Sequence, residues 1–231
     1  MTDIAVHGLT KRYGRITAVD DLSFTIPPGR VTGFVGRNGA GKTTTLRMLL
    51  GLTLPDEGTA TIGGQVYANL KSPIHTVGAL IDPDGFHPGR SGRNALRVLA
   101  KPARIADRRV DEVLDLVDLA DAGHRRVRGY SLGMRQRLGL AAALLGDPAV
   151  LVLDEPANGL DPDGVRWLRA LIRGVGAQGR SVLVSSHLLA ELGQTVDDVI
   201  VIDRGRLIAH QPITDAASLE DTYFRLTKET T

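Results

Sequence analysis

Hydrophobic and polar positions alternate along the first thirty residues of the chain. The apolar members of this alternation are Ile4, Val6, Leu9, Leu22, Phe24 and Ile26. A period of two is typical of strands that bury one face, and the stretch ends at the turn signal Pro27-Pro28-Gly29. The pattern predicts an antiparallel strand pair, and a second piece of the same kind over Gly58 to Tyr67.

Continuous apolar runs, which are typical of strands buried on both faces, follow further along the chain. They cover Val31 to Val35, Val150 to Leu153 and Val182 to Val184. Helical spacing separates these runs, first within Lys42 to Leu50 and later in a second set of residues. That set is Val165, Leu168, Leu171, Ile172 and Val175. Alternation of strand and helix predicts an α/β fold with a parallel sheet at its centre.

Residues 85 to 145 interrupt this alternation with helical patterns alone. One apolar face consists of Val110, Val113, Leu114 and Val117. The segment Leu132 to Leu145 is rich in helix-forming residues. We therefore expect an inserted α-helical subdomain in this part of the chain.

The end of the chain predicts a closing hairpin and a short helix. Val199 to Ile202 and Leu207 to Ile208 flank the turn signal Arg204-Gly205, and Leu219 to Leu226 has helical character. We interpret residues 3–226 as a single domain and residues 227–231 as a short tail.

Composition narrows the class of protein without changing this outline. The 231 residues are 42% hydrophobic and 23% charged, which is enough apolar material for one sizeable core. The formal net charge is only +2 and the basic residues are scattered, so nucleic acid is not an expected partner. The absence of cysteine excludes disulfides and fits a reducing compartment. The longest uncharged apolar stretch, Leu138 to Gly146, is far shorter than the roughly 18 residues that span a bilayer, so we expect no membrane crossing.

A glycine-rich motif lies between the first buried run and the helix after it. It reads Gly36-Arg37-Asn38-Gly39-Ala40-Gly41-Lys42-Thr43, fits the pattern G-x-x-x-x-G-K-[ST], and continues with Thr44. Glycines let backbone N–H groups approach phosphate oxygens closely, and the helix adds its positive N-terminal end. We expect Lys42 to reach the β- and γ-phosphates and Thr43 to ligate Mg²⁺, so the motif predicts a nucleotide phosphate site.

Two carboxylates, Asp154 and Glu155, follow the apolar run Val150 to Leu153. Open α/β sheets hold their ligands at the carboxyl ends of the strands. We expect Asp154 to hold Mg²⁺ through its water shell, and Glu155 to orient or deprotonate the water that attacks the γ-phosphorus. Without the glycine-rich motif, such a pair could equally be a solvated strand edge.

The stretch Tyr130 to Arg137 distinguishes this sequence from other phosphate-loop proteins. Ser131, followed by Leu132 and Gly133, predicts a helix N-terminus whose hydroxyl and N–H groups can bind an anion. Together with Met134, the segment resembles the signature of ABC ATPases. In that family two copies pack head to tail, and each signature segment closes on the ATP held by the other copy. The resemblance implies an ATP-dependent dimer, made either of two copies or with a homologue.

Further matches extend the resemblance over nearly the whole chain. Tyr13 matches the aromatic residue that stacks on adenine. The segment Asn158-Gly159-Leu160-Asp161 resembles the loop that crosses the dimer interface, and Asp161-Pro162 also predicts an N-cap followed by a first helical proline. His187 matches the histidine that contacts the γ-phosphate and steadies the attacking water. The implied fold is a P-loop NTPase with a RecA-like parallel-sheet core, an antiparallel β subdomain and the helical insertion.

Asp82 departs from the common pattern of the family. It ends the segment Val77 to Asp82, where ABC ATPases normally have a glutamine that touches Mg²⁺ and relays the nucleotide state to the membrane subunit. A carboxylate about 5 Å from a phosphate charge is repelled by ~3 kcal/mol at an effective dielectric of about 20, so Asp82 either approaches the metal or turns away. With Phe86 and Pro88, this region resembles the exporter branch of bacitracin and lantibiotic self-protection ATPases.

The resemblance implies a Mg²⁺-dependent ATPase that powers export of a drug, peptide or lipid-like compound through a separate transmembrane permease. It also implies a position on the cytoplasmic face of the cell membrane. The alternative is a soluble ABC ATPase acting on nucleic acid, ribosomes or cofactor assembly, but the chain has one ATPase unit and lacks a coiled-coil insertion and a basic stripe. A GTP-binding switch would need an Asn-Lys-x-Asp segment, which the sequence lacks.

Overall fold

The computed structural model describes residues 2–187 and 195–213. Its first sheet is antiparallel, with three strands in the order β2-β1-β4. These strands are β1 (Ile4–Tyr13), β2 (Ile16–Ile26) and β4 (Glu57–Ile62). The predicted pair within the first thirty residues is confirmed, because Ile4 pairs with Ile26 and Tyr13 with Ile16.

The prediction of a second strand pair over Gly58 to Tyr67 is wrong. This stretch supplies a single strand, β4, which adds to the other edge of β1. The backbone reverses at Gly63 and Gly64, whose φ values are +58° and +73°. After this reversal only an isolated bridge between Ile62 and Gln65 forms, and a 3₁₀ turn, η1 (Tyr67–Asn69), follows.

The second sheet has six strands in the order β5-β6-β7-β3-β8-β9. They are β5 (Val77–Leu80), β6 (Val150–Leu153), β7 (Ser181–Ser186), β3 (Val31–Val35), β8 (Asp198–Asp203) and β9 (Arg206–Pro212). All neighbouring pairs are parallel except β8 and β9, which form the predicted closing hairpin. The parallel core expected from the buried apolar runs is therefore confirmed.

Helices follow the strands in chain order. They are α1 (Lys42–Leu49), α2 (Pro73–Thr76), α3 (Gly92–Ala100), α4 (Asp107–Leu116), η2 (Val127–Gly129), α5 (Leu132–Leu144) and α6 (Pro162–Ala177). The stretch 85–145 is helical as expected, although its first helix begins only after the N-cap Ser91. Across the two described ranges, no helix is long and apolar enough to cross a membrane. The helix expected over Leu219 to Leu226 lies outside the described residues, so the domain limits 3–226 stay a prediction.

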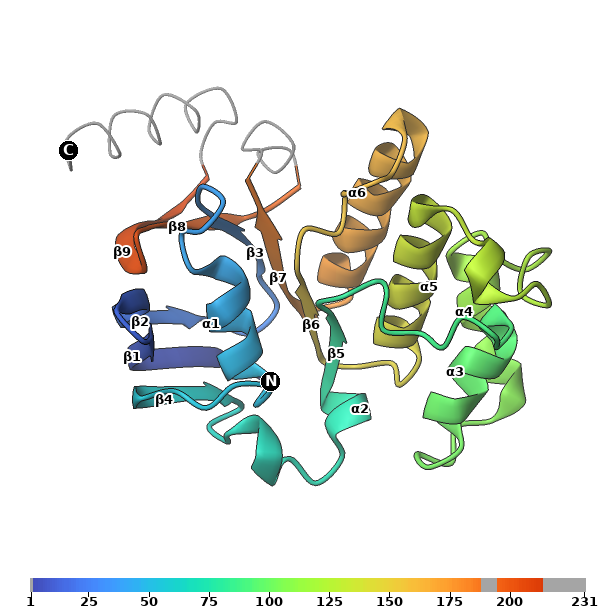
Figure 1. The fold of residues 1–231 in the computed structure, drawn as a ribbon, viewed down its shortest axis with the longest axis horizontal. Helices are drawn as coiled ribbons and strands as arrows, with labels where there is room; N and C mark the ends of the chain where they lie inside the picture. Colours follow the sequence, from blue (N-terminus) through green and yellow to red (C-terminus); the bar gives the residue numbers. More distant parts are fainter. Residues whose placement is uncertain (1, 188–194, 214–231) are drawn as a thin grey trace.

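Side chains of the six-stranded sheet alternate between its two faces and enter two separate cores. In β6, Val150 and Val152 join the core that contains α1 and the antiparallel sheet. Leu151 and Leu153 of the same strand join the core formed with α3, α4, α5 and α6. Figure 1 shows the result: α1 and the small sheet lie on one side of the parallel sheet, and α3 to α6 lie on the other. The carboxyl ends of the central strands lie between these two layers.

Candidate functional site

The glycine-rich loop connects β3 to α1 in a conformation that only glycine permits at two positions. A Cβ added to Gly36 would lie 2.5 Å from the carbonyl oxygen of Ile202. At Gly41, the N-cap of α1, φ is +103° and an added Cβ would lie 2.4 Å from the carbonyl oxygen of Ala18. The loop is therefore packed against its neighbours while Arg37, Asn38 and Gly39 stay exposed. Such a turn leaves backbone N–H groups free to meet an anion.

A cavity of about 340 Å³ opens beside this loop. It is lined by Tyr13, Ala18, Arg37, Asn38, Gly39, Gly41, Lys42, Thr43, Thr44 and Glu155. Tyr13 ends β1 with half of its surface exposed, and the Lys11 ammonium lies 5.6 Å from the centre of its ring. An exposed ring at the rim of a phosphate-binding cavity is well placed to stack on a planar base.

Lys42 is the buried cation of the cavity, with a relative exposure of 6%. Its Nζ donates a hydrogen bond to the carbonyl oxygen of Gly36 at 2.6 Å. The same Nζ lies 3.3 Å from Oε1 of Glu155. A buried ammonium needs such partners, because an unpaired charge in this environment is costly.

Asp154 holds two hydroxyl groups from neighbouring elements at the end of β6. Thr43 Oγ1 donates to its Oδ2 at 2.7 Å, and Ser185 Oγ donates to its Oδ1 at 2.5 Å. The order β6-β7-β3 brings these three side chains together although they are far apart in the sequence. Thr43 and Asp154 thus present two oxygen donors beside the phosphate loop.

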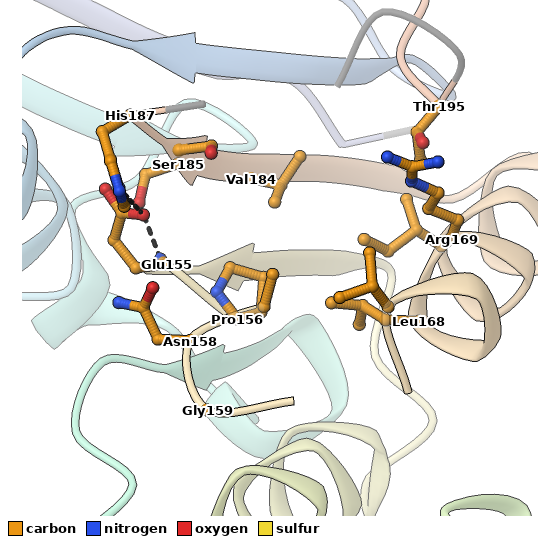
Figure 2. Close-up of a pocket in the computed structure, with 14 residues that line it drawn as sticks. Glu155, Pro156, Asn158, Gly159, Leu168, Arg169, Val184, Ser185, His187 and Thr195 are labelled. Carbon is orange, nitrogen blue, oxygen red and sulfur yellow. Dashed lines mark hydrogen bonds and ion pairs between the residues drawn. The ribbon is translucent and has the colours of Figure 1, made fainter. Parts of the chain in front are cut away.

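Glu155 lies in the left-handed region, with φ of +46°. Its backbone N–H donates to Ser185 Oγ at 2.9 Å, and its Oε2 accepts a hydrogen bond from His187 Nδ1 at 2.8 Å. Figure 2 shows the Glu155 and His187 side chains pointing toward each other, with Asn158 and Pro156 beside them. They border a second cavity of about 160 Å³, whose other end is lined by Leu168 and Arg169. The carboxylate is therefore held between an imidazole and the Lys42 ammonium.

The expected signature segment and interface loop pack on each other. Ser131 caps α5 by accepting a hydrogen bond from Met134 N at 3.2 Å, as predicted. A Cβ on Gly159 would lie 2.3 Å from Cδ2 of Leu132, and one on Gly133 would lie 3.0 Å from the carbonyl oxygen of Gly159. The loop Asn158 to Asp161 thus covers the first turn of α5.

The predicted start of α6 is also confirmed. Asp161 is its N-cap and accepts a hydrogen bond from Gly164 N at 2.7 Å, with Pro162 at the first helical position. Leu160, between Gly159 and this cap, is partly buried against the helical core. The interface loop is therefore fixed at both ends by α5 and α6.

The Asp82 carboxylate takes part in a turn of its own loop. Asp82 is exposed after β5, and its Oδ1 accepts a hydrogen bond from Asp84 N at 2.9 Å. Asp84 in turn lies 2.6 Å from Nε of Arg135, which belongs to α5. The loop that carries Asp82 is therefore tied to the helix that carries the signature segment.

Two residues of the cluster escaped the sequence analysis. Ser185 bridges Asp154 and the backbone of Glu155, and Gln136 Nε2 donates to the carbonyl oxygen of Glu155 at 3.2 Å. Both are polar side chains at buried positions, one in a strand and one on the inner face of a helix. Gln136 stands four residues before the buried Leu140, and this helical spacing was a signal that could have singled it out.

The donor set fits a nucleotide phosphate chain together with Mg²⁺. Within the described ranges, no group of three His, Cys, Asp or Glu side chains could hold a metal ion. Thr43 and Asp154 offer two oxygens 2.7 Å apart, and phosphate and water oxygens would complete the shell. Mg²⁺ usually binds in this way, with few protein ligands and several waters.

Taken together, the parallel sheet, the glycine loop and the strand-end carboxylates define a phosphate-loop nucleotide-binding protein. The sequence profile of the ABC transporter family matches residues 19–158, more than half of the chain. The chain therefore belongs to the ABC transporter family, as an ATP-binding subunit of the ATPase type.

Two curated relatives belong to transporters. The bacitracin transport ATP-binding protein of Bacillus licheniformis is 42% identical over 91% of this chain and 70% of its own length. The lantibiotic transport ATP-binding protein of Streptococcus pyogenes is 30% identical over 95% of both chains. The resemblance to bacitracin and lantibiotic ATPases inferred from the sequence is thus confirmed.

A solved structure confirms the fold. A dimeric ATP-binding cassette in a post-hydrolysis state, bound to ADP and Pi, superimposes with a TM-score of 0.83 over 91% of this chain and 98% of its own. It is 20% identical in sequence, so the likeness concerns the fold alone.

Proposed function

We propose that this chain hydrolyses Mg²⁺–ATP as one half of a head-to-tail dimer, and that hydrolysis powers export through a separate membrane-spanning permease. One observation carries the proposal: Lys42, Asp154, Glu155 and His187 converge beside the glycine loop at the carboxyl end of the parallel sheet. Positioning and electrostatic stabilisation supply most of the catalysis in phosphoryl transfer, and these residues are arranged for both.

Each residue of the cluster has a distinct role in this reaction. Lys42 would exchange its present partners, Gly36 and Glu155, for the β- and γ-phosphates. Thr43 and Asp154 would hold Mg²⁺, which when bound neutralises charge on the phosphate oxygens. Glu155, released from Lys42, would orient and deprotonate the attacking water, with His187 steadying its carboxylate. The approach of Asp82 to the metal stays a prediction.

The dimer follows from where the signature segment lies. The core of α5 and the core of α1 are on opposite faces of the parallel sheet. The turn Ser131 to Met134, whose first two residues are exposed, is thereby placed to meet a nucleotide bound by another subunit. In a head-to-tail pair, Asn158 to Asp161 would pass between the two sites. Tyr13 would stack on adenine, a contact worth ~1 to 3 kcal/mol. The dimeric state of the solved cassette supports this arrangement.

The transported compound and the place of action rest on the relatives. Two relatives are named for bacitracin and lantibiotic transport, which supports export of a drug or peptide. The permease would be a separate polypeptide, and the ATPase would work on the cytoplasmic face of the membrane. Hydrolysis would then drive the permease between its two facing states.

The substitution Glu155→Gln tests the catalytic assignment. It keeps the size of the side chain but removes the carboxylate, so ATP should still bind while kcat falls by roughly 10² to 10⁴. The stalled variant should elute as a dimer from a sizing column in ATP and as a monomer without nucleotide, whereas Lys42→Ala should stay monomeric. A Glu155→Gln variant that hydrolyses ATP at the wild-type rate would refute the assignment.

Capture of partners tests the transport assignment. The tagged chain should recover a multi-span membrane protein in near-equal amount from gently solubilised membranes of its host, as identified by mass spectrometry. Lys42→Ala should recover the same protein, because docking on the permease does not need the phosphate loop. Recovery of only ribosomal or other soluble proteins would favour the non-transport alternative.

A further inference from the structure

Gln136 is a buried polar residue with no role in the chemistry described so far. It lies in α5 with a relative exposure of 2%, among side chains that are almost all apolar. Buried amides are costly unless their hydrogen bonds are made, so such a residue needs a specific reason to be there. Its hydrogen bond from Nε2 to the carbonyl oxygen of Glu155, at 3.2 Å, leads directly to the expected catalytic base.

The backbone of Glu155 needs support from outside. With φ at +46°, this residue is in a conformation that a non-glycine side chain disfavours and that persists only where surrounding contacts enforce it. Ser185 fixes its N–H from β7 at 2.9 Å, and Gln136 fixes its carbonyl oxygen from α5. Asn158 N also donates to this carbonyl oxygen, at 3.1 Å, but from the same turn. Gln136 is therefore the contact that ties the turn of Glu155 to α5.

The orientation of the Gln136 amide is determined by its partner. A carbonyl oxygen can only accept, so the NH₂ group must face Glu155. Its Oε1 is then buried without a hydrogen-bond partner among the residues that the structure describes. An apolar side chain of the same length would remove this unpaired acceptor, so Gln136 is poorly explained by stability alone.

The position of Gln136 along α5 connects two functional sites. It stands about one helical turn after Ser131, whose exposed turn would face the nucleotide of the partner subunit. The same short helix segment therefore reaches the partner's nucleotide at its start and the catalytic base of its own chain a turn later. Helices are stiff over this length, so a shift of one end moves the other.

We propose that Gln136 is a positioning residue that holds the Glu155 backbone in its reactive conformation and links it to the docking of the signature turn on the partner's nucleotide. The inference rests on the proposed function, because it needs both the dimer and the role of Glu155. It predicts that closure of one ATP site sets the geometry of the base in the other.

The test is Gln136→Met, which keeps the length of the side chain and removes both polar atoms. We expect kcat to fall roughly ten-fold with KM within about two-fold, and the Hill coefficient for ATP to fall to about 1. The melting temperature should stay within a few degrees of wild type. Placed in the Glu155→Gln background, Gln136→Met should still allow the ATP-dependent dimer, because neither the phosphate loop nor the signature turn is altered.

Leu138→Ala is the matched control. Leu138 is fully buried on the same helix and its side chain cannot hydrogen-bond to Glu155, so this variant loosens α5 without cutting the link. Its melting temperature should fall while kcat and the Hill coefficient stay near wild type. The inference is overturned if Gln136→Met keeps wild-type kcat and cooperativity, if it abolishes the dimer, or if Leu138→Ala reproduces its kinetics. A wild-type chain without ATPase activity would instead overturn the proposed function, and this inference with it.

Discussion

Single backbone conformations decide whether the nucleotide site can form. The loop between β3 and α1 turns through Gly39 and Gly41, with φ values of +82° and +103°. Glu155 accepts a comparable backbone cost without being glycine, and three hydrogen bonds from Gln136, Ser185 and Asn158 hold it there. Conformations of this kind cost of order 1 to 3 kcal/mol each and are concentrated at functional sites.

Gly41→Ala and Gly39→Ala separate backbone strain from steric collision. Both residues have positive φ, but an added Cβ at Gly41 meets the Ala18 carbonyl oxygen at 2.4 Å, whereas at Gly39 no described atom lies within 4 Å. We expect Gly39→Ala to lower the free energy of unfolding by roughly 1 kcal/mol and Gly41→Ala by about 3 kcal/mol. Urea titration measures both, and equal losses would show that the contact with Ala18 is not decisive.

At the scale of elements, the helical layer is held to the site by the segment that precedes α5. Tyr130 is buried, which raises the pKa of its phenol, so the hydroxyl stays protonated at neutral pH and donates to the Ala122 carbonyl oxygen at 2.7 Å. The first residue of α3, Gly92, packs against this hydroxyl, since a Cβ there would lie 2.3 Å from it. The starts of α3 and α5 are therefore fitted to each other.

A double-mutant cycle tests this fit. Tyr130→Phe should cost about 1 kcal/mol of unfolding free energy through the lost hydrogen bond, and Gly92→Ala about 2 to 3 kcal/mol through overpacking. Once Tyr130→Phe has removed the hydroxyl, the nearest ring atom to the new Cβ is at 3.2 Å, so the cost of Gly92→Ala should drop by about 1 kcal/mol or more. Thermal or urea unfolding of the four proteins gives the coupling energy. Additive losses would mean that the two residues do not share this contact.

For the whole molecule, one sheet with two differently covered faces places the nucleotide and the signature turn on separate layers. The core with α1 supports the phosphate loop, and the core with α3 to α6 supports α5. A ligand bound at the end of the central strands contacts loops from both layers, so nucleotide binding should stabilise the whole fold rather than one part.

Nucleotide and metal removal test this expectation by melting temperature. In the Glu155→Gln variant, ATP with Mg²⁺ at about 100 times its dissociation constant should add ~2.7 kcal/mol of stability, or roughly 5 to 10 °C. Chelation with EDTA should remove a large part of the shift, because Thr43 and Asp154 then lose their link to the phosphates. Adding Lys42→Ala should abolish the shift. An unchanged shift in EDTA would speak against the metal site.

Local chemistry is what the sequence by itself determined about this protein. Alternating and continuous apolar runs predicted the strands, the glycine motif predicted the phosphate loop, and Asp154-Glu155 predicted a reactive strand end, since each signal lies within a few residues. Only the tertiary structure decided that β4 joins β1 as a single strand, and that Ser185 and Gln136 hold the backbone of Glu155. These contacts depend on the strand order β5-β6-β7-β3 and on which face of the sheet α5 covers, because side chains meet by layer and not by distance along the chain.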